Sequence, residues 1–114
     1  MAKKAKVDYD EENDVLWVYS GGKVKDSLEI DNFVIDFSSD DGVVGVEIFN
    51  ASEMISNFVS DKISKEVLSK VKSARLSFYQ SKELVYVIAK LLLPRNDGMK
   101  EVPMQFPAPR EAIA

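Results

Sequence analysis

The residues that could carry chemistry in this sequence are carboxylates on short, strand-like segments that also hold two aromatic residues. Asp8, Asp36 and Glu47 alternate with apolar neighbours, and so do Trp17 and Tyr19. Clustered carboxylates can bind a divalent cation or act as general acid and base. The same side chains on the solvated face of a sheet need have no function beyond contact. Which interpretation applies depends on the strands that position them.

The residue types that are missing narrow the chemistry further. The chain contains no cysteine and no histidine. This excludes disulfides, thiolate zinc sites and thiol nucleophiles, and it removes the commonest general base. The acidic run 10–14 is not an EF-hand calcium loop, because Val15 replaces the required Gly and Gly21 the required Glu. The sequence therefore favours a protein that is not an enzyme and needs no cofactor or metal.

Length and charge point to one small soluble domain. The chain has 114 residues, of which 46% are hydrophobic and 30% charged, and its net charge is −4. A net negative charge makes nucleic acid an unlikely partner. No segment resembles a signal peptide or a membrane helix. We therefore expect a cytoplasmic protein that does not contact a membrane.

The charges are sorted along the chain. Residues 1–59 carry a net charge of −8 and residues 60–100 a net charge of +5. The two parts would complement each other within one chain or across a dimer, and such complementarity guides association. A narrower alternative is a local nucleic-acid contact through the basic residues Lys62, Lys65, Lys70, Lys72 and Arg75.

Two similar hairpins are predicted in the first half, at an offset of 28 residues. Segments 7–18 and 35–46 each have the order strand, polar turn, strand, and their turns end in Asp14 and Gly42. Pairing Ser38 with Val43 makes Phe33, Ile35 and Phe37 face Ile48, Val46 and Val44. The predicted core face comprises Val7, Tyr9, Leu16, Val18, Phe33, Ile35, Phe37, Val44, Val46 and Ile48.

The opposite face of these hairpins is the candidate interaction surface. It carries Asp8, Trp17, Tyr19, Asp36, Gly45 and Glu47, with Val34 among them. Trp17 could cover the bare backbone at Gly45, since glycine in a strand often marks a close approach. The alternatives are a half-solvated sheet face and a contact surface or shallow pocket.

The second half begins with a helical connector over residues 52–71, as one bent helix or two short ones, with Ser52 as N-cap. From residue 73 apolar residues alternate, and segment 84–93 is apolar on both faces, as in a central or partner-covered strand. We take Leu84, Tyr86, Ile88 and Leu91 as a candidate dimer strand. A third strand would end near residue 106, with Pro103 confining it to an edge.

The expected organisation is a single α+β domain. Residues 1–6 are expected to be flexible, 7–50 to form two N-terminal β-hairpins, 52–71 the helical connector, 73–106 a C-terminal antiparallel β-sheet and 107–114 a tail. How the two β segments join, and whether they share one sheet, stays open.

Two segments resemble the domain-of-unknown-function 2283 family. They are Tyr9-Asp10-x-Glu12-x-Asp14-x-Leu16-Trp17-Val18 and the run from Gly42 to Ser52, GVVGVEIFNAS. The resemblance covers about residues 7–52. It implies no established activity, and some members look like partners encoded beside toxin-like proteins.

Two functions from different classes follow. The first is a protein-interaction or self-assembly module, either a homodimer or an antitoxin-like partner of another small protein. The alternative is a small-molecule or divalent-metal binding protein that uses the outer face around Trp17 and Glu47.

Overall fold

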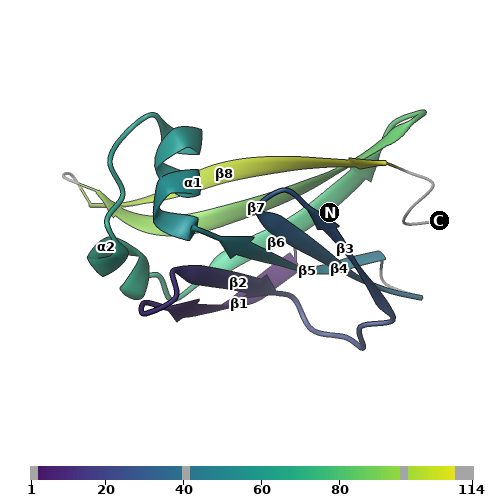
Figure 1. Ribbon diagram of the computed structural model, residues 1–114, viewed down its shortest axis with the longest axis horizontal. Coiled ribbons are helices and arrows are strands. Elements are labelled where there is room, and N and C mark those ends of the chain that lie inside the picture. Colours follow the sequence, from purple (N-terminus) through teal and green to yellow (C-terminus); the bar gives the residue numbers. More distant parts are fainter. Residues whose placement is uncertain (1–2, 40–41, 96–97, 110–114) are drawn as a thin grey trace.

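The computed structural model describes residues 3–39, 42–95 and 98–109, and most of these residues lie in strands (Figure 1). The strands are β1 (Lys3–Asp10), β2 (Val15–Tyr19), β3 (Asp26–Ile30), β4 (Phe33–Ser38), β5 (Gly42–Phe49), β6 (Ala74–Gln80), β7 (Leu84–Arg95) and β8 (Gly98–Pro109). The helices α1 (Ala51–Val59) and α2 (Lys65–Ser69) separate β5 from β6.

All eight strands form one antiparallel sheet in the order β3-β4-β5-β2-β1-β6-β7-β8. Strand β1 joins its two parts. Its first residues, Lys3–Ala5, pair with β6, whereas Lys6–Asp10 pair with β2. The junction between the two halves of the chain is therefore one long strand that changes partners along its length.

The sheet curls so that its two ends meet across a common core. Phe33 of β4 contacts Phe106 of β8, with ring centroids 4.7 Å apart, although these strands are far apart in the sheet order. Phe58 of α1 packs against the same ring at 5.3 Å. Figure 1 shows both helices at one end of the molecule and the long strands β7 and β8 extending toward the other.

The predicted α+β fold is wrong. Instead of separate hairpins and a distinct C-terminal sheet, one curled sheet contains every strand, and the two helices span only nine and five residues. The reason is that β2 pairs with β5 and β1 pairs with β6. Both pairings join segments remote in sequence, and each satisfies strand edges that an isolated hairpin would leave open.

The register of the two hairpins is confirmed for most of their length. Tyr9 pairs with Leu16, and Ile35 pairs with Val46. Near the second turn the prediction is wrong, because a β-bulge shifts the register so that Phe37 pairs with Val43 and Ser38 with Gly42. Val43 thereby joins the main core cluster, and Val44, which was predicted for the core face, is also fully buried. The turn residues Asp40 and Asp41 lie outside the described residues.

Strand β3 was not expected, although it has a recognisable signal. Leu28 and Ile30 alternate with polar residues, and Asp31-Asn32 forms a two-residue connection to β4. Asp31 has a φ of 49°, the left-handed conformation that such tight turns use.

The second half also departs from expectation at its boundaries. Helix α1 begins at Ala51 with Asn50 as its N-cap, so the assignment of Ser52 as cap is wrong. Strand β8 is the edge strand expected from Pro103, but it continues to Pro109, and Ala108 is buried. Residues 110–114 of the predicted tail, and 96–97 of the predicted loop, lie outside the described residues. Among the described residues, neither helix has the length and apolarity that crossing a membrane requires.

Candidate functional site

The six residues of the candidate interaction surface lie together on the outer face of the sheet, which we call the acidic–aromatic face. The register forms two adjacent rows across β1, β2, β5 and β4. One row contains Asp8, Trp17 and Glu47, and the other contains Tyr19, Gly45 and Asp36. These six residues come from four separate strands of the chain, and they meet on one surface because each strand presents every second residue to it.

Trp17 lies against Gly45 at the centre of this face. A Cβ atom built on Gly45 would be 3.4 Å from Trp17 Nε1, 3.2 Å from Asp36 Oδ2 and 3.3 Å from the Val18 carbonyl oxygen. The indole N–H is enclosed and has no hydrogen-bond partner among the described residues. The Trp17 and Tyr19 rings stack with centroids 4.8 Å apart. The glycine therefore allows the indole and a carboxylate to approach the strand closely.

The carboxylates of this face differ in their surroundings. Asp8 is exposed, whereas Asp36 is buried and its Oδ1 accepts a hydrogen bond from Ser27 Oγ at 2.6 Å. Burial, and then the nearby charge of Asp36, raise the pKa of Glu47 above its ordinary value. Among the described residues, no three acidic side chains converge closely enough to hold a metal ion.

The candidate dimer strand lies inside the sheet, between β6 and β8. Leu84, Tyr86 and Ile88 are half-buried on its outer face, and Leu91 is fully buried on its inner face. The difference follows from the two-residue period of a strand. Tyr86 stacks on Tyr79, which is 48% exposed, at 4.9 Å.

A neutral surface surrounds these tyrosines. On the neighbouring strand, Pro107 lies opposite Tyr86 and Pro109 opposite Leu84. Ile88 lies between Ser77 and Gln105, so among the described residues these positions of the outer face carry no charged side chain. We call it the tyrosine patch; it comprises Tyr79, Leu84, Tyr86, Ile88, Pro107 and Pro109.

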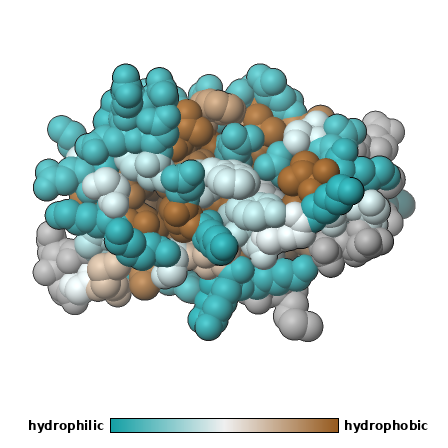
Figure 2. Space-filling model, turned by 90° about the horizontal axis from the view of Figure 1, so that it is seen from below, coloured by the Kyte–Doolittle hydropathy of each residue, from teal (hydrophilic) through white to brown (hydrophobic). Residues whose placement is uncertain are grey.

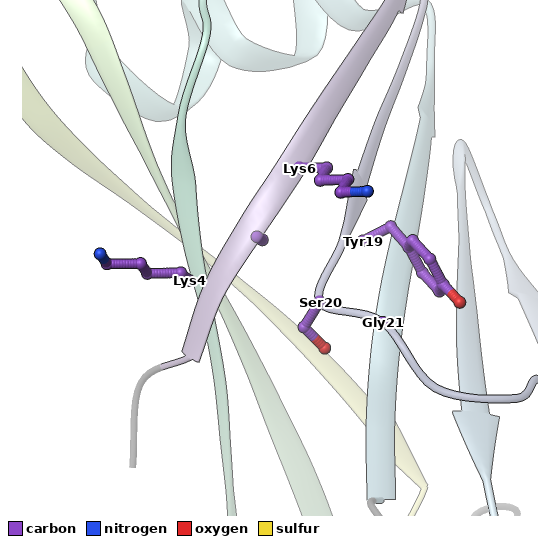
Figure 3. A pocket seen from close by; sticks show the side chains of 6 residues that line it. Lys4, Lys6, Tyr19, Ser20 and Gly21 are labelled. Atoms are coloured by element: carbon purple, nitrogen blue, oxygen red, sulfur yellow. The ribbon is translucent and has the colours of Figure 1, made fainter.

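A third group of residues was not predicted as a group, although Arg75 was among the basic residues considered for a nucleic-acid contact. Lys4 of β1, Arg75 of β6 and Lys90 of β7 occupy directly opposite positions and form what we call the cationic row. The row lines a hollow of about 440 Å³, and a second hollow of about 270 Å³ adjoins it between Lys4, Lys6 and Tyr19 (Figure 3). Figure 2 shows the molecule from below the view of Figure 1; on that surface hydrophobic side chains are interspersed with hydrophilic ones.

Sequence reasoning missed the cationic row because it depends on a pairing between β1 and β6, some seventy residues apart. One signal was available: Lys90 is the single charge within an otherwise apolar strand segment. A charge at such a position must face outward, so the sequence could have indicated that Lys90 lies on the surface, but not which residues lie beside it.

Comparison with known proteins places the chain among proteins of unknown function. The family model described as "Protein of unknown function (DUF2283)" matches residues 6–52. An uncharacterized protein of Methanocaldococcus jannaschii is 37% identical over 98 residues, covering 82% of this chain and 77% of that protein. The chain belongs to the DUF2283 family.

A second relative of this DUF2283 protein is named "Putative hypoxanthine phosphoribosyltransferase" and comes from Methanosarcina mazei. It is 30% identical over 95 residues, which cover 82% of this chain and 72% of that protein. No solved structure matches the chain.

The residues that carry the DUF2283 resemblance include a hydrogen-bond network at the start of α1. Asp14 Oδ1 accepts hydrogen bonds from Tyr9 Oη at 2.8 Å and from the backbone N–H of Ser52 at 3.0 Å. Asp14 Oδ2 accepts another from Ser52 Oγ at 2.7 Å, and the Asp14 carbonyl oxygen accepts one from the Ala51 N–H. These contacts attach the β1–β2 turn to the first turn of the helix.

The electrostatics of this network indicate a structural role. Burial acts to raise the pKa of Asp14, but hydrogen bonds from Ser52 and Tyr9 outweigh it, so that the pKa lies below its ordinary value. Burial and the Asp14 carboxylate raise the pKa of Tyr9. The Asp14 carboxylate is therefore held ionised at the positive end of the α1 dipole, where an anion stabilises a helix. In this DUF2283 protein, these motif residues fasten α1 to the sheet.

Proposed function

We propose that this DUF2283 protein is a self-assembly module that forms a homodimer through the tyrosine patch. The observation that carries the proposal is the composition of that patch: two stacked tyrosines, Leu84 and Ile88 share the outer face, and none of the described residues paired with them there is charged. Exposed apolar patches of this kind mark interaction sites, and tyrosine is enriched at protein interfaces.

A second copy suits this patch because the patch is neutral. In a two-fold interface each surface faces its own equivalent, so a patch that carried like charges would repel itself. The tyrosine patch brings no such charges together. The hydroxyl groups of Tyr79 and Tyr86 and the side chains of Ser77 and Gln105 add neutral hydrogen-bonding groups to it.

The test is the molar mass of the protein in solution, measured by size-exclusion chromatography with light scattering over a range of concentrations. We expect the wild type to reach twice the 12.8 kDa mass of the chain. The double variant Tyr79→Lys, Ile88→Lys should stay monomeric, because it would place like charges in the centre of the interface. Circular dichroism checks that this variant is folded.

The matched control is Val24→Lys, which adds the same charge at an exposed apolar residue outside the patch. This variant should dimerise like the wild type. A wild type that is monomeric at every concentration, or a double variant that dimerises as well as the wild type, contradicts the proposal. A complex only with another small protein, as in the antitoxin-like alternative, also contradicts it.

The alternative function, a small-molecule or divalent-metal site around Trp17 and Glu47, has its own test. Thermal unfolding is measured with Mg²⁺, Ca²⁺ and Mn²⁺ for the wild type and for Glu47→Gln. A cation that binds at Glu47 raises the melting temperature of the wild type more than that of the variant. Equal responses of the two proteins remove this alternative for the cations.

A further inference from the structure

The cationic row destabilises the sheet locally, and nothing in the packing of the fold requires it. Lys4, Arg75 and Lys90 lie directly opposite one another on three adjacent strands. Like charges in such positions destabilise a sheet. Within the described residues one ion pair reaches the row, between Arg75 Nε and Glu101 Oε2 at 3.7 Å. Three positive charges are thus close together, and one carboxylate, that of Glu101, pairs with one of them. A bound anion would neutralise the remaining positive charge.

The two hollows beside the row give such an anion a place. The larger one, of about 440 Å³, is lined by all three cations and by Ser73 and Glu101, among others. The smaller one, of about 270 Å³, shares Lys4 and Ala5 with it. Sites for small organic ligands usually measure about 300–1,000 Å³. The adjoining hollows therefore suit a ligand larger than a single inorganic ion.

The far end of the smaller hollow is aromatic. Tyr19 lines it, with its ring stacked on Trp17 and its hydroxyl donating a hydrogen bond to the Gly22 carbonyl oxygen. Figure 3 shows Lys6 directed toward the Tyr19 ring and Lys4 on the other side of β1. An aromatic ring suits a nucleobase, which stacks on such rings, and lysine and arginine suit phosphate.

The charges along β1 limit the length of the ligand. The outward-facing residues of this strand are Lys4 and Lys6, followed by Asp8 and Asp10. A long polyanion that passed Lys6 would meet the acidic–aromatic face. We propose that the two hollows bind a nucleoside phosphate, with its phosphates at the cationic row and its base against Tyr19.

The experiment is isothermal titration calorimetry of the full chain at low salt with ATP, AMP, adenosine and pyrophosphate. We expect ATP to bind more tightly than AMP or pyrophosphate, and adenosine to bind most weakly. Lys90→Gln should weaken ATP binding about tenfold, as expected for the loss of one charge-assisted contact. Glu101→Gln should strengthen ATP binding, because it removes the carboxylate that competes for Arg75.

Further variants separate the base from the phosphates and give the control. Tyr19→Leu should weaken ATP binding but leave pyrophosphate binding unchanged. Lys82→Gln, which removes an exposed lysine in the turn between β6 and β7, should bind ATP like the wild type. Thermal unfolding of Lys90→Gln should show a melting temperature no lower than that of the wild type, because the substitution relieves repulsion.

Several outcomes would overturn the inference. They are the absence of ATP binding at millimolar concentrations, equal ATP affinity in Lys90→Gln and the wild type, and equal ATP affinity in Tyr19→Leu and the wild type. A single-stranded 12-nucleotide DNA that binds far more tightly than ATP would show a nucleic-acid surface instead. The tyrosine patch and the cationic row consist of different residues, and dimerisation is measured by molar mass rather than by ATP binding, so the two proposals fail separately.

Discussion

Asp14 shows how a motif that attracts attention as a cluster of polar residues can serve folding. Its carboxylate accepts three hydrogen bonds, two of them from Ser52 in the first turn of α1. Only 7% of Asp14 is exposed, and its φ of 56° is a conformation that aspartate and asparagine tolerate better than most residues. The side chain and the backbone conformation therefore both favour this residue type at the turn.

The substitution Asp14→Asn should lower the free energy of unfolding at pH 7 by about 1–2 kcal/mol, because the amide nitrogen cannot accept these hydrogen bonds. The loss is measured by urea unfolding. Asp10→Asn is the control, since Asp10 is exposed in the same turn and bonds only locally to Asn13; it should change stability by less than about 0.5 kcal/mol. Equal losses in the two variants would contradict the role assigned to Asp14.

The comparison of the wild type with Asp14→Asn should also depend on pH. The pKa of Asp14 in the folded protein lies below its ordinary value of 3.8. The ionised Asp14 carboxylate therefore contributes fully to the stability of the fold above about pH 4. This contribution is lost as the pH falls through the lower pKa of the folded state. The stability difference between wild type and Asp14→Asn should shrink below about pH 4. A difference that stays constant from pH 7 to pH 2 would contradict this assignment.

Glu47 should show the opposite sign. Its pKa is raised in the folded protein, so protonation favours folding: that benefit is full below the ordinary pKa of 4.5 and is lost as the pH rises through the raised value. Glu47→Gln should therefore increase stability at pH 7, by about 0.5 kcal/mol, and the gain should disappear near pH 4. Thermal unfolding at pH 7 and at pH 4 checks this prediction. The control is Glu29→Gln, because Glu29 is an exposed residue of β3.

Among the strands, β2 and β5 owe their close association to a glycine. The Cβ that any other residue would add at Gly45 lies only 3.3 Å from the Val18 carbonyl oxygen of β2, a backbone atom that cannot turn aside. The indole of Trp17 and the carboxylate of Asp36 close over the same position. This pairing holds the first hairpin to the second and so builds the acidic–aromatic face.

Gly45→Val should destabilise the protein by about 1–3 kcal/mol through overpacking between β2 and β5. The measurement is chemical unfolding, with the fluorescence of Trp17 as a local probe. Gly45→Val in a Trp17→Leu background should cost less, because a smaller side chain leaves room beside the strand. An unchanged stability of the single variant would show that Trp17 and Asp36 do not enclose this position.

The molecule as a unit depends on contacts that close the curl of the sheet. Phe106 is fully buried and contacts both Phe33 of β4 and Phe58 of α1. Its ring thus connects the last strand, one of the first strands and the helix between them. The helices cover one end of the core, and α1 is itself attached to the β1–β2 turn through Asp14.

Phe106→Ala should lower the free energy of unfolding by about 3–5 kcal/mol, the usual cost of removing a buried phenylalanine. Phe49→Ala is the control, because Phe49 is 39% exposed and should cost much less. Hydrogen exchange should show faster exchange in β4, β8 and α1 together in Phe106→Ala. A loss of protection in β8 alone would indicate that the two ends of the sheet are not coupled through this ring.

Local alternation was sufficient to predict the strands other than β3, most of the hairpin register and the six residues of the acidic–aromatic face. These features depend on residues less than about fifty positions apart, and burial of Ile35 and Val46 penalises a one-residue slip in their pairing. The left-handed turn positions at Asp14 and Gly42 followed from the same local chemistry.

The partners of each strand could not be read in this way. The pairing of Lys3–Ala5 with β6 and the contact of Phe33 with Phe106 bring together residues about seventy positions apart. An alternating pattern indicates which face of the sheet a residue occupies but not which strand lies beside it. Any strand edge with free backbone N–H and C=O groups can form the hydrogen bonds that a neighbouring strand needs. Packing of the complete core made that choice, and with it created the cationic row.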